Sequence, residues 1–327
     1  MQQESSVTGA WPTLGNEAAA AVDKVSRSVV AVHGRRRIPS SGVYWREGIV
    51  VTANHAVERD EEIHLTFPDG SDVAATLGGR DASTDVAILK VTAPNLAVPD
   101  HGSTRELKPG HLVVVAGRTA EGTPRAGLAM ISVTGPAFRA WTGGTIDLTL
   151  RLDRNLHPNL SGGPALDSTG DVVGIATPAL SRFSATVIPA STIDRVSAEL
   201  EKRGHIGRGY LGVGMQRVAL PDKLRESLKL SNEAGAMVVA VEPGGPAEKA
   251  GVLIGDILVA LEGRPLTNTE DLAAHLSGGQ IGKTVKVSLI RGGALTDVTI
   301  TVGERPAGEG RPFRARWGRG HGGFRGR

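Results

Sequence analysis

The sequence contains no cysteine, few aromatic residues and no long apolar run. The absence of cysteine excludes disulfides, thiolate nucleophiles and zinc sites with cysteine ligands. Aromatic residues make up 3% of the 327 residues, so the core must be built from Val, Ile, Leu and Ala. No segment reaches the roughly 18 apolar residues of a membrane-spanning helix. Histidines do not cluster with acidic residues at metal-ligand spacing, so we expect no metal and no cofactor.

The N-terminal segment, residues 1–16, is polar and lacks the charged-then-apolar pattern of an export signal. As written, this segment predicts a cytoplasmic protein. A truncated or mis-assigned start would instead allow a location in the periplasm or the cell envelope.

Charge is unevenly distributed along the chain. The net charge is +3, but residues 304–327 hold seven arginines and two glutamates, so this tail carries +5 and the rest about −2. The tail is rich in Gly and Arg and has too little apolar surface to fold, so we expect disorder. It could bind RNA or an acidic surface by phosphate pairing and stacking. We favour a flexible solubilising tail, because no globular nucleic-acid-binding motif accompanies it.

The remaining chain is long enough for two domains. Residues 29 to about 187 show short β-branched runs bounded by Gly, Asp or Pro, which is typical of an antiparallel sandwich or barrel. Helices are expected at 16–25, with Asn16 as N-cap, and at 191–202, with Gly204 as the stop. A Pro-Asp-Gly sequence at 68–70 predicts a hairpin turn.

Residues 209–303 read as a compact α+β domain. Three strand-like runs alternate there with two expected helices, near 246–250 and at 269–276. We place the boundary between the two domains at 204–208.

Three short segments carry residue types that catalyse acyl transfer. His55 ends an apolar run, Asp85 precedes another, and Ser161 is followed by two glycines and a proline. Each alone is ordinary, since such a His or Asp is more often structural. Their order, His, Asp, Ser, within an all-β context is that of the chymotrypsin-type triad.

The chemistry of acyl transfer explains these residue types. A serine hydroxyl is a weak nucleophile and needs a base within hydrogen-bond reach. His55 would take the proton of Ser161 and return it to the leaving amine, while Asp85 would orient the imidazole and stabilise the imidazolium. Glycines beside the serine allow backbone N–H groups to point at the developing oxyanion.

Longer segments around these residues resemble the HtrA (DegP-like) family of serine proteases. Residues 152–164 (LDRNLHPNLSGGP) resemble the family's Thr-Asp-Ala-Ala-Ile-Asn-Pro-Gly-Asn-Ser-Gly-Gly-Pro segment. Residues 52–57 resemble its histidine motif, residues 80–91 its aspartate motif, and residues 209–213 the opening of its PDZ domain. The likeness runs in order through about residues 17–303.

This resemblance implies a mostly β chain, with a chymotrypsin-like double β-barrel protease domain over residues 17–204 and an α+β PDZ domain over residues 209–303. His55, Asp85 and Ser161 would form the triad. Family members commonly assemble as trimers through the N-terminal segment, where Trp11 is the only aromatic residue before the first helix.

One departure from the family concerns the oxyanion hole. By resemblance the N–H groups of Asn159 and Ser161 are the two donors, but the family has Gly at the position of Asn159. Glycine permits backbone angles that most residues resist, although Asn tolerates the left-handed region better than others. Leu160 replaces a polar residue, which is a milder change.

The resemblance also assigns the substrate-contacting residues. The first subsite would be uncharged and would accept small or medium aliphatic side chains, with a lining that includes Asn155, Ile175, Ala176 and Thr177. The PDZ groove would hold a peptide as an added strand and its terminal carboxylate in a short loop. Its residues would be Tyr210, Leu211, Gly212, Val213, Leu272 and Leu276.

Three functions remain open at this point. The first is a serine endopeptidase that hydrolyses unfolded or damaged proteins and binds unfolded polypeptides or C-terminal peptides through its PDZ domain. The second is a peptide-binding scaffold or chaperone, catalytically weak or inactive because of Asn159. The third is an RNA-associated factor acting through the tail.

Overall fold

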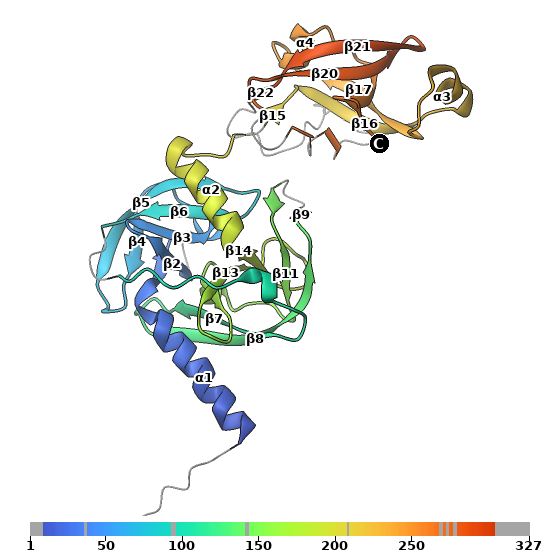
Figure 1. Ribbon diagram of the computed structural model, residues 1–327. Helices are drawn as coiled ribbons and strands as arrows, with labels where there is room; N and C mark the ends of the chain where they lie inside the picture. Colours follow the sequence, from blue (N-terminus) through green and yellow to red (C-terminus); the bar gives the residue numbers. More distant parts are fainter. Residues whose placement is uncertain are drawn as a thin grey trace, which may run out of the picture. The chain divides into compact units, whose positions relative to one another are not determined.

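The computed structural model describes residues 9–35, 38–92, 96–140, 144–207, 209–267, 271–272, 275–276 and 280–304. The chain divides into two compact units, Met1–Ile206 and Gly207–Arg327 (Figure 1). The predicted tail lies outside the described residues except for Glu304, and the predicted helix at 269–276 lies partly outside them.

Two closed antiparallel barrels of six strands each build the first unit (Figure 1). In order around the first barrel the strands are β1 (Val29–His33), β2 (Ser40–Arg46), β3 (Ile49–Ala53), β6 (Val86–Lys90), β5 (Asp72–Asp81) and β4 (Ile63–Thr66). Around the second they are β11 (Thr149–Leu152), β14 (Thr186–Pro189), β13 (Val172–Thr177), β12 (Pro164–Leu166), β7 (Leu112–Arg118) and β8 (Pro124–Gly135). A short pair, β9 (Phe138–Arg139) and β10 (Thr145–Ile146), follows β8.

Several barrel strands are continuous apolar runs because both of their faces are buried. Successive side chains of a strand point to opposite sides. In β3, Val50 packs inside the first barrel, whereas Ile49 and Val51 face a second core that also receives residues from the other barrel. In β13, Val173 lies inside the second barrel and Ile175 in that same shared core. The shared core therefore joins the two barrels.

Helix α2 (Ala190–Arg203) closes the first unit and covers the shared core. Ile193, Val196 and Leu200 lie on one buried face, as the sequence predicts. Gly204 ends the helix with φ +73, and its N–H donates to the carbonyl of Leu200. This left-handed cap is the conformation that favours glycine.

Helix α1 (Ala10–Val25) begins six residues earlier than predicted, so the choice of Asn16 as N-cap is wrong. Gly9 precedes the first turn without a side-chain cap. Pro12 lies in the first turn of α1, where a proline removes no helical hydrogen bond. The hairpin at 68–70 is confirmed: the N–H of Gly70 donates to the carbonyl of Phe67, and Gly70 has φ +81.

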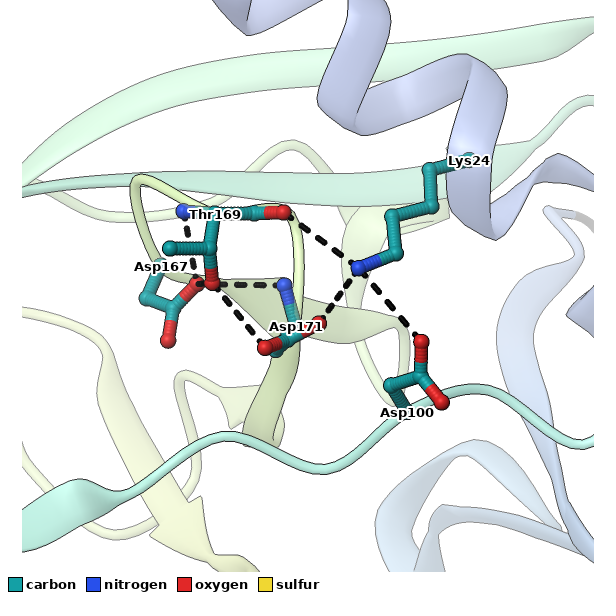
Figure 2. A network of polar contacts seen from close by, with 5 residues as sticks. All are labelled: Lys24, Asp100, Asp167, Thr169 and Asp171. Carbon is teal, nitrogen blue, oxygen red and sulfur yellow. Dashed lines mark hydrogen bonds and ion pairs between the residues drawn. The ribbon is translucent and has the colours of Figure 1, made fainter.

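The C-terminal end of α1 is attached to the second barrel by a polar network (Figure 2). The Lys24 ammonium lies 2.5 Å from Asp171 Oδ1 and 3.5 Å from Asp100 Oδ2, and it donates to the carbonyl of Thr169. Asp167 accepts bonds from the hydroxyl and N–H of Thr169, which orders the turn before β13. The hydrogen bond from Lys24 lowers the pKa of the Asp171 carboxyl.

The second unit is an α+β domain built on one antiparallel sheet. In order the strands are β16 (Val213–Ala219), β17 (Ala234–Val241), β18 (Ile257–Leu261), β20 (Thr284–Arg291) and β21 (Ala294–Thr301), with β19 (Arg264–Pro265) also paired to β18. A second pair joins β15 (Gly209–Tyr210) to β22 (Gly303–Glu304). The helices described with both of their ends are α3 (Asp222–Leu228), which was not predicted, and α4 (Pro246–Lys249).

The predicted fold class is confirmed. The chain is mostly β, with a chymotrypsin-like double barrel followed by a smaller α+β unit.

Candidate active site

Strand pairing brings His55 and Asp85 together. β3 and β6 are antiparallel neighbours in which Ala53 pairs with Val86, so the residues just beyond these ends face each other. His55 lies in the turn after β3, and Asp85 lies immediately before β6. The N–H of Asn54 donates to the carbonyl of Asp85 and extends the ladder by one bond.

The Asp85 carboxylate is buried and accepts three hydrogen bonds. Its Oδ1 accepts the backbone N–H of His55 at 2.9 Å. Its Oδ2 accepts His55 Nδ1 at 2.8 Å and the Thr177 hydroxyl at 2.5 Å. Asp85 has φ +59, a left-handed conformation that Asp tolerates better than most residues and that is enriched at functional sites. These bonds fix the imidazole with Nε2 directed away from the carboxylate.

Ser161 completes the arrangement from the other barrel. It follows the 3-10 helix η4 (Pro158–Leu160) and precedes β12. Its Oγ lies 2.8 Å from His55 Nε2. The hydroxyl, the imidazole and the carboxylate therefore form one continuous hydrogen-bonded chain across the two barrels.

The two glycines after Ser161 are required by the space around them. A Cβ on Gly162, which has φ +78, would lie 2.5 Å from the carbonyl oxygen of Ser41 and from Thr52 Oγ1. A Cβ on Gly163 would lie 2.0 Å from the carbonyl oxygen of Ala116. Both contacts are with backbone or buried atoms, so the nucleophile loop reaches this position only without side chains here.

The two predicted oxyanion donors are engaged within the loop itself. The Ser161 N–H donates to the carbonyl of Pro158 at 3.3 Å, and the Asn159 N–H donates to His157 Nδ1 at 3.3 Å. The first is a backbone bond of the 3-10 type, and the second is a cap that the His157 side chain provides to the same helix. Asn159 lies in that helix and not in the left-handed region, so its side chain causes no backbone strain.

The residues predicted for the first subsite occupy different environments. Asn155 is exposed, but Ile175 is fully buried in the shared core and Ala176 in the core of the second barrel. Ala176 contacts the nucleophile loop through its backbone, which bonds to Gly162 and Gly163. The side chains of Ile175 and Thr177 are not available to line a subsite, because one packs in the core and the other bonds Asp85.

Two contacts around the candidate site were not predicted from the sequence. Thr177 was placed in the subsite, yet its hydroxyl bonds the carboxylate of a residue 92 positions away. Ser41 was not considered, yet its backbone and side chain contact the nucleophile loop. Nothing in the local sequence signals either contact, because both depend on the approach of distant strands.

In the second unit, some of the residues predicted to form the peptide groove are buried in the core, and others lie in the loop before β16. Leu211, Leu272 and Leu276 are almost completely buried in one core, and Val213 packs against it. Gly212 has φ +78, and a Cβ there would lie 3.2 Å from the Tyr210 hydroxyl. That hydroxyl contacts the Glu242 carboxylate.

The edge of the same sheet lies beside this loop. Among the strands that the structure describes, β16 pairs with β17 alone, so its other edge is free.

Within the described ranges, no group of three or more His, Cys, Asp or Glu side chains is arranged to hold a metal ion. None of the helices described is long and apolar enough to cross a membrane.

Comparisons with known proteins agree with this architecture. Residues 40–175 match the family model of the trypsin-like peptidase domain, and residues 209–302 match that of the PDZ domain. The fold, the triad geometry and these matches define a trypsin-like peptidase unit followed by a PDZ domain.

The relatives narrow this class further. The chain is 35% identical over 266 residues to the "Probable periplasmic serine endoprotease DegP-like" of Pseudomonas putida (strain GB-1), a match that covers 80% of this chain and 54% of that protein. The protein of the same name from Rhizobium meliloti (strain 1021) is 35% identical, over 84% of this chain and 55% of the relative. The chain thus spans about half the length of the curated relatives it matches.

Solved structures point to the same family. The serine endoprotease from Yersinia pestis has a TM-score of 0.71 and 27% identity, covering 88% of this chain and 98% of that one. The HtrA-type protease AlgW with decapeptide has a TM-score of 0.71 and 25% identity, covering 88% of this chain and 99% of that one. The chain belongs to the HtrA-type, DegP-like serine proteases.

The comparisons do not support the cytoplasmic location predicted from the N-terminal residues. The curated relatives carry the word periplasmic in their names.

Proposed function

We propose that this protein is a serine endopeptidase that cleaves unfolded or damaged polypeptides. The observation that carries the proposal is the hydrogen-bonded chain from Ser161 Oγ through His55 to Asp85, with both links at 2.8 Å. His55 would remove the proton of Ser161 as the hydroxyl attacks the scissile carbonyl, and would then protonate the leaving amine. Asp85, held by Thr177, would stabilise the imidazolium.

Oxyanion stabilisation would require an exchange of hydrogen-bond partners. The N–H groups of Asn159 and Ser161 now donate to His157 and Pro158. A bound substrate carbonyl would take the place of these partners as charge develops on its oxygen. The inactive alternative rests on the side chain at Asn159, whose backbone is here in the 3-10 conformation. The Asn159→Gly variant tests that alternative.

The test is cleavage of unfolded fluorescein-labelled casein by the wild type, Ser161→Ala and Asn159→Gly. We expect cleavage by the wild type and a loss of about 10⁶-fold in kcat for Ser161→Ala, as when another serine protease loses its nucleophile. Asn159→Gly should remain active. An inactive wild type together with an active Asn159→Gly variant would instead assign a peptide-binding role to this chain.

We further propose that the second unit binds a peptide by adding it as a strand to the free edge of β16. The loop from Tyr210 to Val213, with the left-handed Gly212, would hold the end of the peptide. The pairing of β16 on one side only supports this proposal. Replacement of Gly212 by Val should weaken binding of a labelled C-terminal peptide in a fluorescence-polarisation titration.

The location and assembly of the protein are also proposals. We propose that it acts in the periplasm or the cell envelope, as the names of its relatives suggest, and that it forms a homotrimer. Trp11, on α1, is 80% exposed and is the proposed contact residue. A Trp11→Ala variant with the wild-type mass in light scattering would contradict that role. RNA binding by the tail stays the less favoured alternative to a solubilising tail, and deletion of residues 304–327 would test it.

A further inference from the structure

A buried hydroxyl beside the nucleophile loop belongs to Ser41, which follows the first residue of β2. Its Oγ donates to the carbonyl of Asn159 at 2.5 Å and accepts the N–H of Arg118 at 2.9 Å. Its backbone N–H donates to the carbonyl of Ser161 at 3.0 Å. One residue of the first barrel thus holds the carbonyls of two loop residues on the second.

We propose that Ser41 is a positioning residue for the oxyanion hole. The two oxyanion N–H groups belong to Asn159 and Ser161, the same residues whose carbonyls Ser41 holds. Its hydroxyl fixes the peptide plane between Asn159 and Leu160, and its N–H fixes the plane after Ser161. The N–H groups of the hole are therefore attached to a backbone that Ser41 keeps in one orientation.

The packing around this hydroxyl supports a dedicated role. A Cβ on Gly117 would lie 2.5 Å from Ser41 Oγ, so the absence of a side chain at position 117 leaves room for the hydroxyl. Leu160, between the two held carbonyls, has its side chain buried against Gly117 and Gly127. Ser41 holds the carbonyls of Asn159 and Ser161, and packing holds the Leu160 side chain between them. The Pro158–Asn159 peptide is therefore the part of the loop that can rotate to present its N–H to a substrate.

Removal of the Ser41 hydroxyl should slow the chemical step of cleavage. In Ser41→Ala the Asn159 carbonyl loses this donor, so the peptide samples other orientations and the hole is less preorganised. Removal of a whole oxyanion donor costs about 10²–10³-fold in kcat. We expect Ser41→Ala, which only loosens the donors, to lower kcat by about 10–100-fold. KM should change by less than about two-fold, because no substrate-contacting group is removed.

Ser40→Ala is the matched control. Ser40 is the neighbouring residue on β2 and is equally buried, but its hydroxyl has no hydrogen-bond partner in the part of the chain that the structure describes. This variant should keep the wild-type kcat and KM.

A second pair of variants separates hydrogen bonding from packing. Gly117→Ala alone should push the Ser41 hydroxyl away and lower kcat as Ser41→Ala does. In Ser41→Ala/Gly117→Ala the new methyl occupies the space of the lost hydroxyl. A Cβ on Gly117 would also lie 3.0 Å from Leu160 Cδ2 and 3.1 Å from the Asn159 carbonyl oxygen, so its effect is not confined to the Ser41 bond. The double variant should therefore have a kcat no higher than that of Ser41→Ala and a higher melting temperature than Gly117→Ala.

The measurement is kcat and KM on fluorescein-labelled casein, with thermal unfolding of each variant. This inference rests on the proposed peptidase function, and a wild type that does not cleave casein would overturn both. With an active wild type, two results would overturn the role of Ser41 alone: a kcat for Ser41→Ala within about three-fold of wild type, or recovery of the wild-type kcat in the double variant.

Discussion

The two units use their buried polar groups for different purposes. In the first unit, buried groups from both barrels surround the triad. Thr177 bonds Asp85, Asp85 bonds His55, and Ser41 bonds the nucleophile loop, and each of these contacts joins residues distant in sequence. In the second unit, the buried Asp256 pairs with Arg291 and the proposed binding site is the backbone of an edge strand. Cleavage by the first unit should therefore be sensitive to small displacements of its catalytic groups. Peptide binding by the second unit should depend mainly on whether that unit stays folded.

The largest effect that this comparison predicts is that of Gly163→Ala. The new Cβ would lie 2.0 Å from the Ala116 carbonyl, so Ser161 must move relative to His55. A displacement of about 1 Å at a catalytic group can cost about 10²-fold in rate. We expect casein cleavage to fall by at least that factor, while peptide binding by the second unit, measured by fluorescence polarisation, is retained.

Gly15→Ala is the control for a glycine substitution in the same unit. Gly15 lies within α1, and a Cβ there meets nothing within 4 Å. If Gly163→Ala cleaved casein at the wild-type rate, the nucleophile loop would tolerate displacement. The first unit would then be no more sensitive to small displacements than the second.

A smaller effect is expected from Thr177→Val, which removes the hydroxyl that bonds Asp85 and keeps the shape of the side chain. A hydrogen bond to a charged group contributes about 1.5–3 kcal/mol, and 1.4 kcal/mol corresponds to about ten-fold in rate. We expect kcat to fall by about ten-fold or more, measured on labelled casein.

Thr186→Val provides a matched control for this substitution. Thr186 is the register partner of Thr177 on β14 and is buried, but its hydroxyl has no partner among the described residues. Equal losses in the two variants would mean that the effect of Thr177 comes from packing and not from its bond to Asp85.

In the second unit, Asp256→Asn should change stability and its pH dependence without lowering cleavage. The hydrogen bonds from Arg291 hold the pKa of Asp256 below its usual value. A carboxyl with a lowered folded pKa contributes stability above its unfolded pKa of about 3.9 and loses it as pH falls through the folded pKa. Thermal unfolding from pH 7 to pH 2 should show this loss in the wild type.

The Asp256→Asn variant should be less stable than the wild type at pH 7, and the two should converge in acid. An unchanged difference between them across that pH range would contradict the proposed ion pair.

The smallest effect is expected from Lys24→Met, which breaks the network that joins α1 to the second barrel (Figure 2). The ammonium and its partners are partly exposed, and such surface ion pairs contribute little and are screened by salt. We expect a slight decrease in melting temperature at low salt that disappears in 1 M NaCl. A large, salt-independent decrease would place this network among the core interactions of the first unit.

Much of the fold could be predicted from local patterns. The β-branched runs identify the barrel strands, the spacing of Ile193, Val196 and Leu200 identifies the buried face of α2, and Gly204 marks its end. The start of α1 could not be predicted, because Pro12 and Gly15 oppose a helix that α1 nevertheless forms. Burial of Ala21 and Val25 in the shared core favours this helix over its local propensity.

For the candidate site, the residue types and their order indicated the triad, and the glycines after Ser161 indicated a tight loop. The subsite stays a prediction, and within it the Ile175 side chain packs in the shared core while the Thr177 hydroxyl bonds Asp85. An alternating strand shows which residues share a face, but not whether that face meets substrate or another barrel. The conformation at Asn159 was also beyond local reasoning.

The sequence by itself determined the two-domain organisation, the barrel class and the identities of His55, Asp85 and Ser161. Periodicity and turn residues indicated an antiparallel sandwich or barrel, and the order of side chains suited to acyl transfer indicated the three residues. The resemblance to the HtrA family added the barrel class and the triad roles. Only the tertiary structure decided that Thr177 holds Asp85 and that Ser41 holds the nucleophile loop. Those contacts join residues 92 and 118 positions apart, and hydrogen bonds require an approach within about 3 Å that only the packing of the two barrels creates.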